Sequence, residues 1–164
     1  MKQILVLIFL LFSCFSLYSK EVKLFKSFGL NNPMSSLFVR TIAQDSDDFM
    51  WFGSHEGLHR FDGHQLLSFH HEATKPNSLS SDVISKILID SKQRLWVGTA
   101  GAGLNLFREK QQDFIRFNTE SGNASLSNNV INVLFEDSLG QLWVGTEQGL
   151  NILKLVDCQW QSTQ

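Results

Sequence analysis

Cysteine and proline are scarce in this sequence, each occurring twice in 164 residues. With so little proline and so many phenylalanine and tryptophan side chains, the chain is not expected to be disordered. Basic and acidic residues nearly cancel, which leaves a net charge of -2. This balance gives no reason to expect binding to nucleic acid or to an anionic membrane surface. Beyond the N-terminal segment, no apolar run is long enough to span a membrane.

The longest apolar run begins at the N-terminus. Lys2 precedes an unbroken apolar stretch over residues 4–12, well short of the roughly 20 residues that a membrane span needs. This pattern is typical of a secretion signal over residues 1–19, with cleavage after Ser19. An uncleaved anchor and lipidation at Cys14 are the alternatives. The segment predicts export to the periplasm or another extracytoplasmic location, with membrane anchoring left open.

Cleavage after Ser19 would remove Cys14 and leave Cys158 as the one cysteine of the mature chain. No internal disulfide is then expected. Cys158 is predicted to be a small buried apolar residue near the chain end, in preference to a reactive thiol.

Over residues 20–164 a single pattern occurs three times, in units covering about 35–69, 80–118 and 127–160. Each unit has a serine near its start, then an aspartate, then a tryptophan. The intervals between successive copies are 45 and then 47 residues for all three residue types. The anchors are Ser35, Ser80 and Ser127; Asp45, Asp90 and Asp137; Trp51, Trp96 and Trp143. A period of this length indicates a repeat architecture.

Each unit is expected to contain four short strands. In the second unit, the predicted strands cover residues 83–89, 94–99, 104–108 and 113–118, with polar or glycine-rich turns between them. Four antiparallel strands per period form one blade of a β-propeller. The sequence therefore predicts an all-β fold, a partial propeller of about three blades in an open arc, because a closed ring needs roughly 4–8 blades.

The repeated tryptophans are expected to pack between blades. Leu95-Trp96-Val97 is apolar at consecutive positions, as in a strand buried on both faces. Each tryptophan offers a large surface to a neighbouring blade, and the glycine two residues later leaves room for a close approach. Truncating any of the three tryptophans to alanine is expected to cost roughly 3–5 kcal/mol. The alternative interpretation is that the tryptophans are aromatic platforms for a sugar.

The third unit resembles the two-component regulator propeller repeat. The resemblance is carried by Asp-Ser-Leu-Gly-Gln-Leu-Trp-Val-Gly-Thr over residues 137–146 and by the Gly-Leu-Asn of 149–151. The segments 77–80 and 60–63 are similar to the same family, and the match extends over roughly residues 22–155. Propellers of this family form the extracytoplasmic sensory part of bacterial receptors, which carry a histidine kinase or a diguanylate cyclase after a membrane span.

The resemblance implies a ligand-sensing or interaction module without enzymatic activity of its own and without its output domain. No cofactor is expected. The expected partners are an unidentified extracellular ligand, for which a carbohydrate is one candidate, and either the remaining blades of a parent receptor or a second copy of the chain. Residues 22–28 could add a strand that closes a ring. An open arc should expose two apolar faces, so we expect the isolated chain to aggregate, self-associate or unfold easily.

The alternative function is that of a propeller enzyme, a glycan hydrolase or lyase, and two motifs of the sequence resemble enzyme motifs. Residues 55–59 match the zinc-protease pattern H-E-x-x-H, but that chemistry needs a helix and the repeat places the motif on a hairpin reversal. Asp137, Gly140 and Trp143 are similar to the aspartate box of sialidase-like folds, although Leu142 stands where that box has threonine.

His70 and His71 fall in a polar connection and are expected to be solvated. Acidic and histidine residues show no repeated arrangement that would converge on one point. The sequence therefore assigns no catalytic residue and no metal ligand, and it leaves the binding residues unknown.

Overall fold

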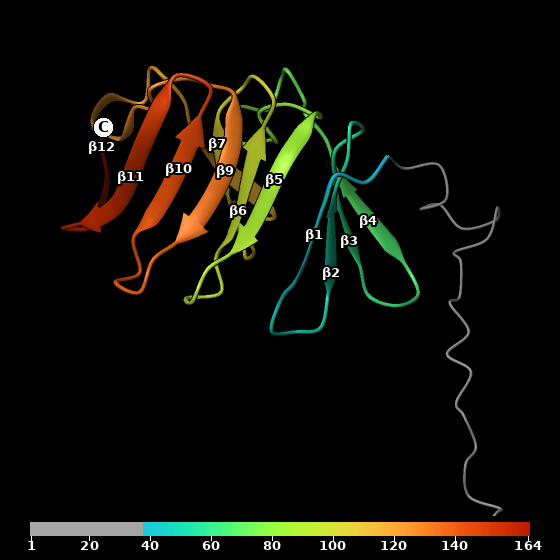
Figure 1. Cartoon of the computed structure of the whole chain (residues 1–164). Coiled ribbons are helices and arrows are strands. Elements are labelled where there is room, and N and C mark those ends of the chain that lie inside the picture. Colours follow the sequence, from blue (N-terminus) through green and yellow to red (C-terminus); the bar gives the residue numbers. More distant parts are fainter. Residues whose placement is uncertain (1–37) are drawn as a thin grey trace, which may run out of the picture.

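The computed structural model describes residues 38–164, which form three four-stranded antiparallel sheets (Figure 1). The predicted signal over residues 1–19 and the predicted extra strand at 22–28 lie outside the described residues. The first sheet consists of β1 (Thr41–Gln44), β2 (Met50–Gly53), β3 (Leu58–Phe61) and β4 (Leu66–Phe69). The second consists of β5 (Ile84–Ile89), β6 (Leu95–Thr99), β7 (Leu104–Arg108) and β8 (Asp113–Phe117). The third consists of β9 (Ile131–Glu136), β10 (Leu142–Thr146), β11 (Gly149–Val156) and β12 (Gln159–Thr163).

Each sheet is a meander, in which the second, third and fourth strands each pair with the strand that precedes them in the chain. The four strands predicted for the second unit agree with β5–β8 to within one residue at each end. Between β8 and β9 the chain forms a single 3₁₀ turn, η1 (Gly122–Ala124). Among residues 38–164, no helix has the length and apolar character needed to cross a membrane.

The three sheets stand face to face as consecutive blades, with β1, β5 and β9 adjacent to one another (Figure 1). The strands β4, β8 and β12 form the opposite edge of each blade. This arrangement is a partial β-propeller with its blades in an open arc, as predicted.

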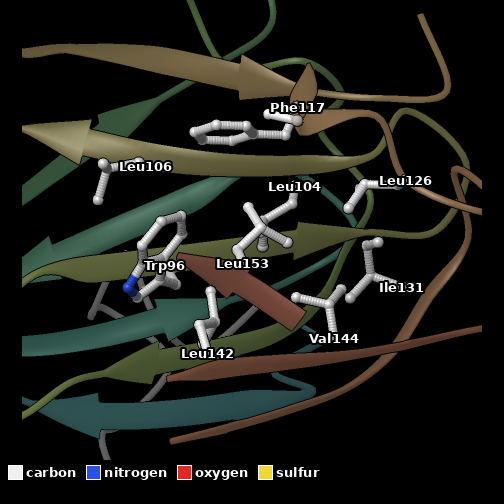
Figure 2. Packing of buried hydrophobic residues seen from close by; sticks show 10 residues of the cluster. Trp96, Leu104, Leu106, Phe117, Leu126, Ile131, Leu142, Val144 and Leu153 are labelled. Atoms are coloured by element: carbon white, nitrogen blue, oxygen red, sulfur yellow. The ribbon is translucent and has the colours of Figure 1, made fainter. Parts of the chain in front are cut away.

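The hydrophobic core lies between the blades. One cluster joins blades 1 and 2 and includes Trp51, Leu58, Ile84 and Phe107. A second cluster joins blades 2 and 3 (Figure 2). Its buried members are Trp96, Leu104, Leu106, Phe117, Ala124, Leu126, Ile131, Leu142, Val144 and Leu153. Because neighbouring residues of an extended strand point to opposite faces, every β6 residue of blade 2 is buried against one neighbour or the other.

We call the face of a blade that looks toward the preceding blade its leading face, and the opposite one its trailing face. In blade 2, Leu95 and Val97 belong to the leading face, and Trp96 belongs to the trailing face. Trp96 makes an edge-to-face contact with Trp160 of blade 3, with ring centroids 5.0 Å apart. Trp51 contacts Phe107 of blade 2 in the same way at 5.2 Å. The predicted packing role is confirmed for these two tryptophans.

The two outermost faces expose apolar side chains. On the trailing face of blade 3, Phe135 is 60 % exposed and Trp143 is only partly buried. On the leading face of blade 1, Ile42 is 57 % exposed. Both faces are therefore apolar, as expected for a partial propeller.

The prediction that Cys158 is buried is wrong. Asp157 and Cys158 form the two-residue turn between β11 and β12, and their φ angles are 48° and 61°. The turn lies at the end of the β11–β12 hairpin, beyond the part of the blade that packs against its neighbour, so the Cys158 thiol is exposed.

Candidate functional site

The aspartate and tryptophan of each unit form a hydrogen-bonded pair. The indole Nε1 donates to a carboxylate oxygen of the aspartate six residues earlier, at 2.6 Å for Trp51, 2.8 Å for Trp96 and 2.8 Å for Trp143. The other carboxylate oxygen accepts from two backbone N–H groups of the turn that follows. The aspartate thus closes the turn between the first two strands and fixes the tryptophan at the blade interface.

Hydrogen bonds lower the pKa of two of these carboxylates, Asp90 and Asp137. Burial alone would raise the pKa of Asp90, but hydrogen bonds from Trp96 and from Arg94 outweigh it and hold the pKa below its ordinary value. The pKa of Asp137 is lowered by the hydrogen bond from Trp143 and by those from the turn backbone. Because all three aspartates bond within their own blades, the sialidase-like motif has a structural role in this chain.

The H-E-x-x-H segment lies on the hairpin between β2 and β3, as the repeat predicts. The Ser54 N–H donates to the Gly57 carbonyl at 3.0 Å, which closes the reversal. His55 is exposed and lies edge-on to Phe38, whereas His59 is buried on β3. In the part of the chain that the structure describes, no three His, Cys, Asp or Glu side chains gather as metal ligands.

His59 lies between two serines. Its Nε2 is 3.0 Å from the Ser54 hydroxyl and its Nδ1 is 2.8 Å from the Ser68 hydroxyl. A serine beside a histidine can suggest a nucleophile, but the Ser54 hydroxyl is fully buried and also bonds the Gly57 carbonyl and the Glu56 N–H.

The corresponding threonines of the other blades show that this serine is structural. Thr99 Oγ1 donates to the Gly103 carbonyl and accepts from the Ala102 N–H, which is the same pattern that Ser54 makes in blade 1. His59 likewise occupies the position of Asn105 and Asn151, each of which bonds a serine in the segment that opens its unit.

His70 and His71 are exposed, as predicted, although both have partners. His70 Nδ1 lies 3.8 Å from a carboxylate oxygen of Asp82, and the His71 backbone N–H donates to the same oxygen. His71 Nδ1 is 2.8 Å from the Leu79 carbonyl. These contacts order the connection between blades 1 and 2.

That connection lines the best candidate for a binding site. A groove of about 540 Å³ lies between β4, the connecting residues 70–79 and the β7–β8 turn. Phe69, which is partly exposed, and the exposed Pro76 supply apolar surface, whereas Leu79 and Phe114 lie behind the groove wall and are buried. Polar side chains at the groove include Glu72, Thr74, Lys75, Asn77, Gln111 and Gln112.

Arg116 of β8 fixes one wall of this groove. Its guanidinium donates to the carbonyls of Lys75, Ser78 and Leu79 and to the Ser78 hydroxyl, over 2.8–3.3 Å. The Phe114 N–H donates to the Asn77 carbonyl at 2.8 Å. The wall is therefore held to blade 2 before any ligand binds, which lowers the entropy lost on binding.

The groove joins a small apolar patch at Phe69 and Pro76 to amide, hydroxyl and paired charged groups, a combination suited to a polar organic molecule with some apolar surface. Glu72 and Lys75 pair with each other at 2.7 Å, so neither leaves a strong uncompensated charge at the rim. Sequence reasoning missed this groove because its walls come from two different units. The one sequence feature that could have indicated the groove was the polar segment 77–80, which opens the second unit.

Comparison with known proteins identifies the repeat. The profile of the family described as "Two component regulator propeller" matches residues 33–56, 78–101 and 125–148. The three units are two-component regulator propeller repeats. Each match includes the aspartate–tryptophan pair of a unit together with the turn that the aspartate closes. No curated protein sequence matches the chain.

Solved structures show the same fold. The regulator propeller is similar to the extracellular domain of the hybrid two-component system BT3049 from B. thetaiotaomicron, with 25 % identity and a TM-score of 0.72 over 82 % of this chain. The chain spans 19 % of that protein's length.

Two further structures are similar in fold. PorZ, a surface component of the type-IX secretion system of Porphyromonas gingivalis, is 24 % identical over 68 % of this chain and 17 % of its own, with a TM-score of 0.54. Virginiamycin B lyase from Staphylococcus aureus is 19 % identical over 85 % of this chain and 44 % of its own, with a TM-score of 0.55.

Proposed function

We propose that this regulator propeller is a signal-recognition module that acts outside the cytoplasm as part of a bacterial signal-transduction receptor. The observation that carries the proposal is that all three units match the regulator repeat. The similarity to the extracellular domain of a hybrid two-component system supports the same role and the same location. Any kinase or cyclase output would belong to another part of such a receptor.

We assign ligand recognition to the groove between blades 1 and 2. The partly exposed Phe69 ring and the side-chain amides of the groove suit a carbohydrate, whose C–H faces pack on apolar surface while its hydroxyls bond amides. The module is proposed to bind without turnover. This assignment is supported by the repeated aspartates, whose carboxylates are engaged in their own blades.

A panel of soluble oligosaccharides tests this function, with calorimetry to follow binding and chromatography to follow products. We expect a member of the panel to bind and to remain intact. Gln111→Ala should weaken that binding, whereas Lys110→Ala is the matched control, because Lys110 is the adjacent turn residue and does not line the groove. Cleavage of a bound sugar would instead favour the alternative, a propeller hydrolase or lyase.

Export is tested separately by intact-mass measurement of the chain expressed in a bacterial host. Cleavage after Ser19, or a lipid adduct at Cys14, would support the extracytoplasmic location. A full-length soluble product in the cytoplasm would contradict it.

A further inference from the structure

At each interface between blades, a branched side chain of one blade lies over a glycine of the blade before it. A Cβ atom added to Gly98 would come within 2.6 Å of Ile131 Cγ2, and one added to Gly53 within 2.5 Å of Ile84 Cγ2. Ile84 and Ile131 are both fully buried. We call the space above the glycine the notch and the isoleucine that fills it the knob.

The third notch is open. Gly145 is the counterpart of Gly53 and Gly98, and the three described heavy atoms nearest to a Cβ atom added there all belong to Val133 of its own blade, at 3.3 Å or more. Around this notch, Leu150 is 51 % exposed. Its counterparts in blades 1 and 2, Leu58 and Leu104, are fully buried against the following blade.

Blade 1 carries the matching knob. Val39 occupies the position that Ile84 and Ile131 hold in the other two blades, one repeat interval earlier in each case, and it is 36 % exposed. Ile42, the counterpart of the buried Ile87, is also exposed. The chain therefore has an empty notch on its last described face and a partly exposed knob on its first.

We propose that the trailing face of blade 3 binds the leading face of blade 1 of a second copy of this chain, with Val39 of that copy entering the notch at Gly145. This head-to-tail contact would repeat an interface that already occurs twice within the chain. Two copies joined at both of these faces bring six described blades together, which lies within the roughly 4–8 blades of closed propellers. The proposal does not depend on the ligand or on the signalling role.

Sedimentation of the full chain over a range of concentrations tests this contact. The wild-type chain is expected to dimerise. Gly145→Val fills the notch and should weaken dimerisation at least about tenfold, as expected when a central packing contact is lost. The fold should survive, because the atoms nearest to the added Cβ belong to Val133, which is itself exposed; circular dichroism and a thermal melt check this. Gly98→Val, at the filled notch, should instead disrupt the fold.

A second pair of variants tests the same contact in case Gly145→Val changes the fold. Leu150→Glu places a charge on the same trailing face and should also weaken dimerisation. Leu155→Glu is the matched control, because Leu155 lies on the same strand, has the same 51 % exposure and points to the opposite face.

Mixing variants tests the direction of the contact. Val39→Asp should remove the knob and keep the notch. Gly145→Val should fill the notch and keep the knob. Each variant alone should be monomeric, and the mixture should form a 1:1 complex through its one intact interface. A monomeric wild type would overturn the proposal and leave the face for another occupant, such as a further blade of a longer chain. Dimerisation that resists both variants, or a mixture that stays monomeric, would overturn it as well.

Discussion

Asp90 accepts a 2.8 Å hydrogen bond from the indole N–H of Trp96, and both side chains are buried. The same carboxylate also accepts from the Arg94 guanidinium at 2.6 Å. Arg94 in turn lies over the rings of Trp96 and Trp160, with its Cζ 5.5 and 5.1 Å from their centroids. Asp90 thus bonds the turn backbone, the Trp96 indole and the Arg94 guanidinium. Through its cation–π contact with Trp160, Arg94 reaches blade 3.

The three tryptophans should differ in their contribution to stability, although the repeat alone predicts that they are equal. Trp96→Ala should lower the free energy of unfolding by about 3–5 kcal/mol, because Trp96 is fully buried between blades 2 and 3. Trp143→Ala should cost only about 1 kcal/mol, because Trp143 lies on an outer face. Urea unfolding of both variants in the Gly145→Val background, in which the trailing face of blade 3 is expected to stay uncovered, measures both costs, and equal losses would contradict the partial burial of Trp143.

The buried aspartate should make stability depend on acid pH. The pKa of Asp90 in the folded chain lies below 3.8, its ordinary value, so the unfolded chain binds the proton more readily. The stabilisation is complete above about pH 4 and is lost as the pH falls through the folded pKa. The difference in unfolding free energy between wild type and Asp90→Asn should therefore be largest near neutral pH and shrink below about pH 4.

Urea unfolding at stepped pH values measures this difference. Asp47→Asn is the control, because Asp47 is exposed and its substitution should leave the acid response unchanged. A difference between wild type and Asp90→Asn that stays constant down to pH 2 would show that the Asp90 carboxylate does not carry the effect.

A second pH effect is expected from His59. Burial, together with the neighbouring His70, lowers its pKa below the ordinary 6.5, against a smaller opposing effect of Glu56. As the pH falls below about 6.5, the unfolded chain gains the proton first, and the folded chain loses up to about 1.4 kcal/mol per pH unit. His59→Asn supplies the residue that the other two blades have at this position and should flatten the stability profile between pH 7 and about 5.

Thermal melts across this pH range provide the measurement. His64→Asn is the matched control, because His64 is exposed in the β3–β4 turn and should leave the slope as it is in the wild type. If His64→Asn flattened the profile and His59→Asn did not, the buried histidine would not be the titrating group.

Cys158 should react with a maleimide in the native state. Its thiol is exposed in the β11–β12 turn, so labelling should proceed without denaturant. Peptide mapping by mass spectrometry would locate the adduct, and Cys158→Ser provides the control. Labelling that requires urea would indicate that the turn is covered in solution.

The repeat pattern predicts what lies within one unit. The strand bounds, the buried Trp96 and the need for space at Gly98 all follow from residues a few positions apart, where strand alternation and turn chemistry act. The sequence does not reveal that Ile131 fills the space above Gly98, because the two residues belong to different units. For the same reason, neither wall of the groove between blades 1 and 2 could be assigned.

The error at Cys158 has a local cause. A cysteine near the end of a β-rich chain is most often buried, but β11 continues to Val156 and the next two residues form the turn. The three tryptophans are not equally buried, and the reason is global. A repeat describes each unit alone, whereas burial depends on whether another unit lies beside it.

Each unit contains both a glycine notch and a branched knob, on opposite faces of the same blade. A unit can therefore be duplicated or deleted in the gene without creating a mismatched interface, because any knob meets a notch of the same kind. Changes in repeat number would then need no compensating substitutions at the junction. At this pair of positions, the number of blades could then change while the residues that join them stay the same.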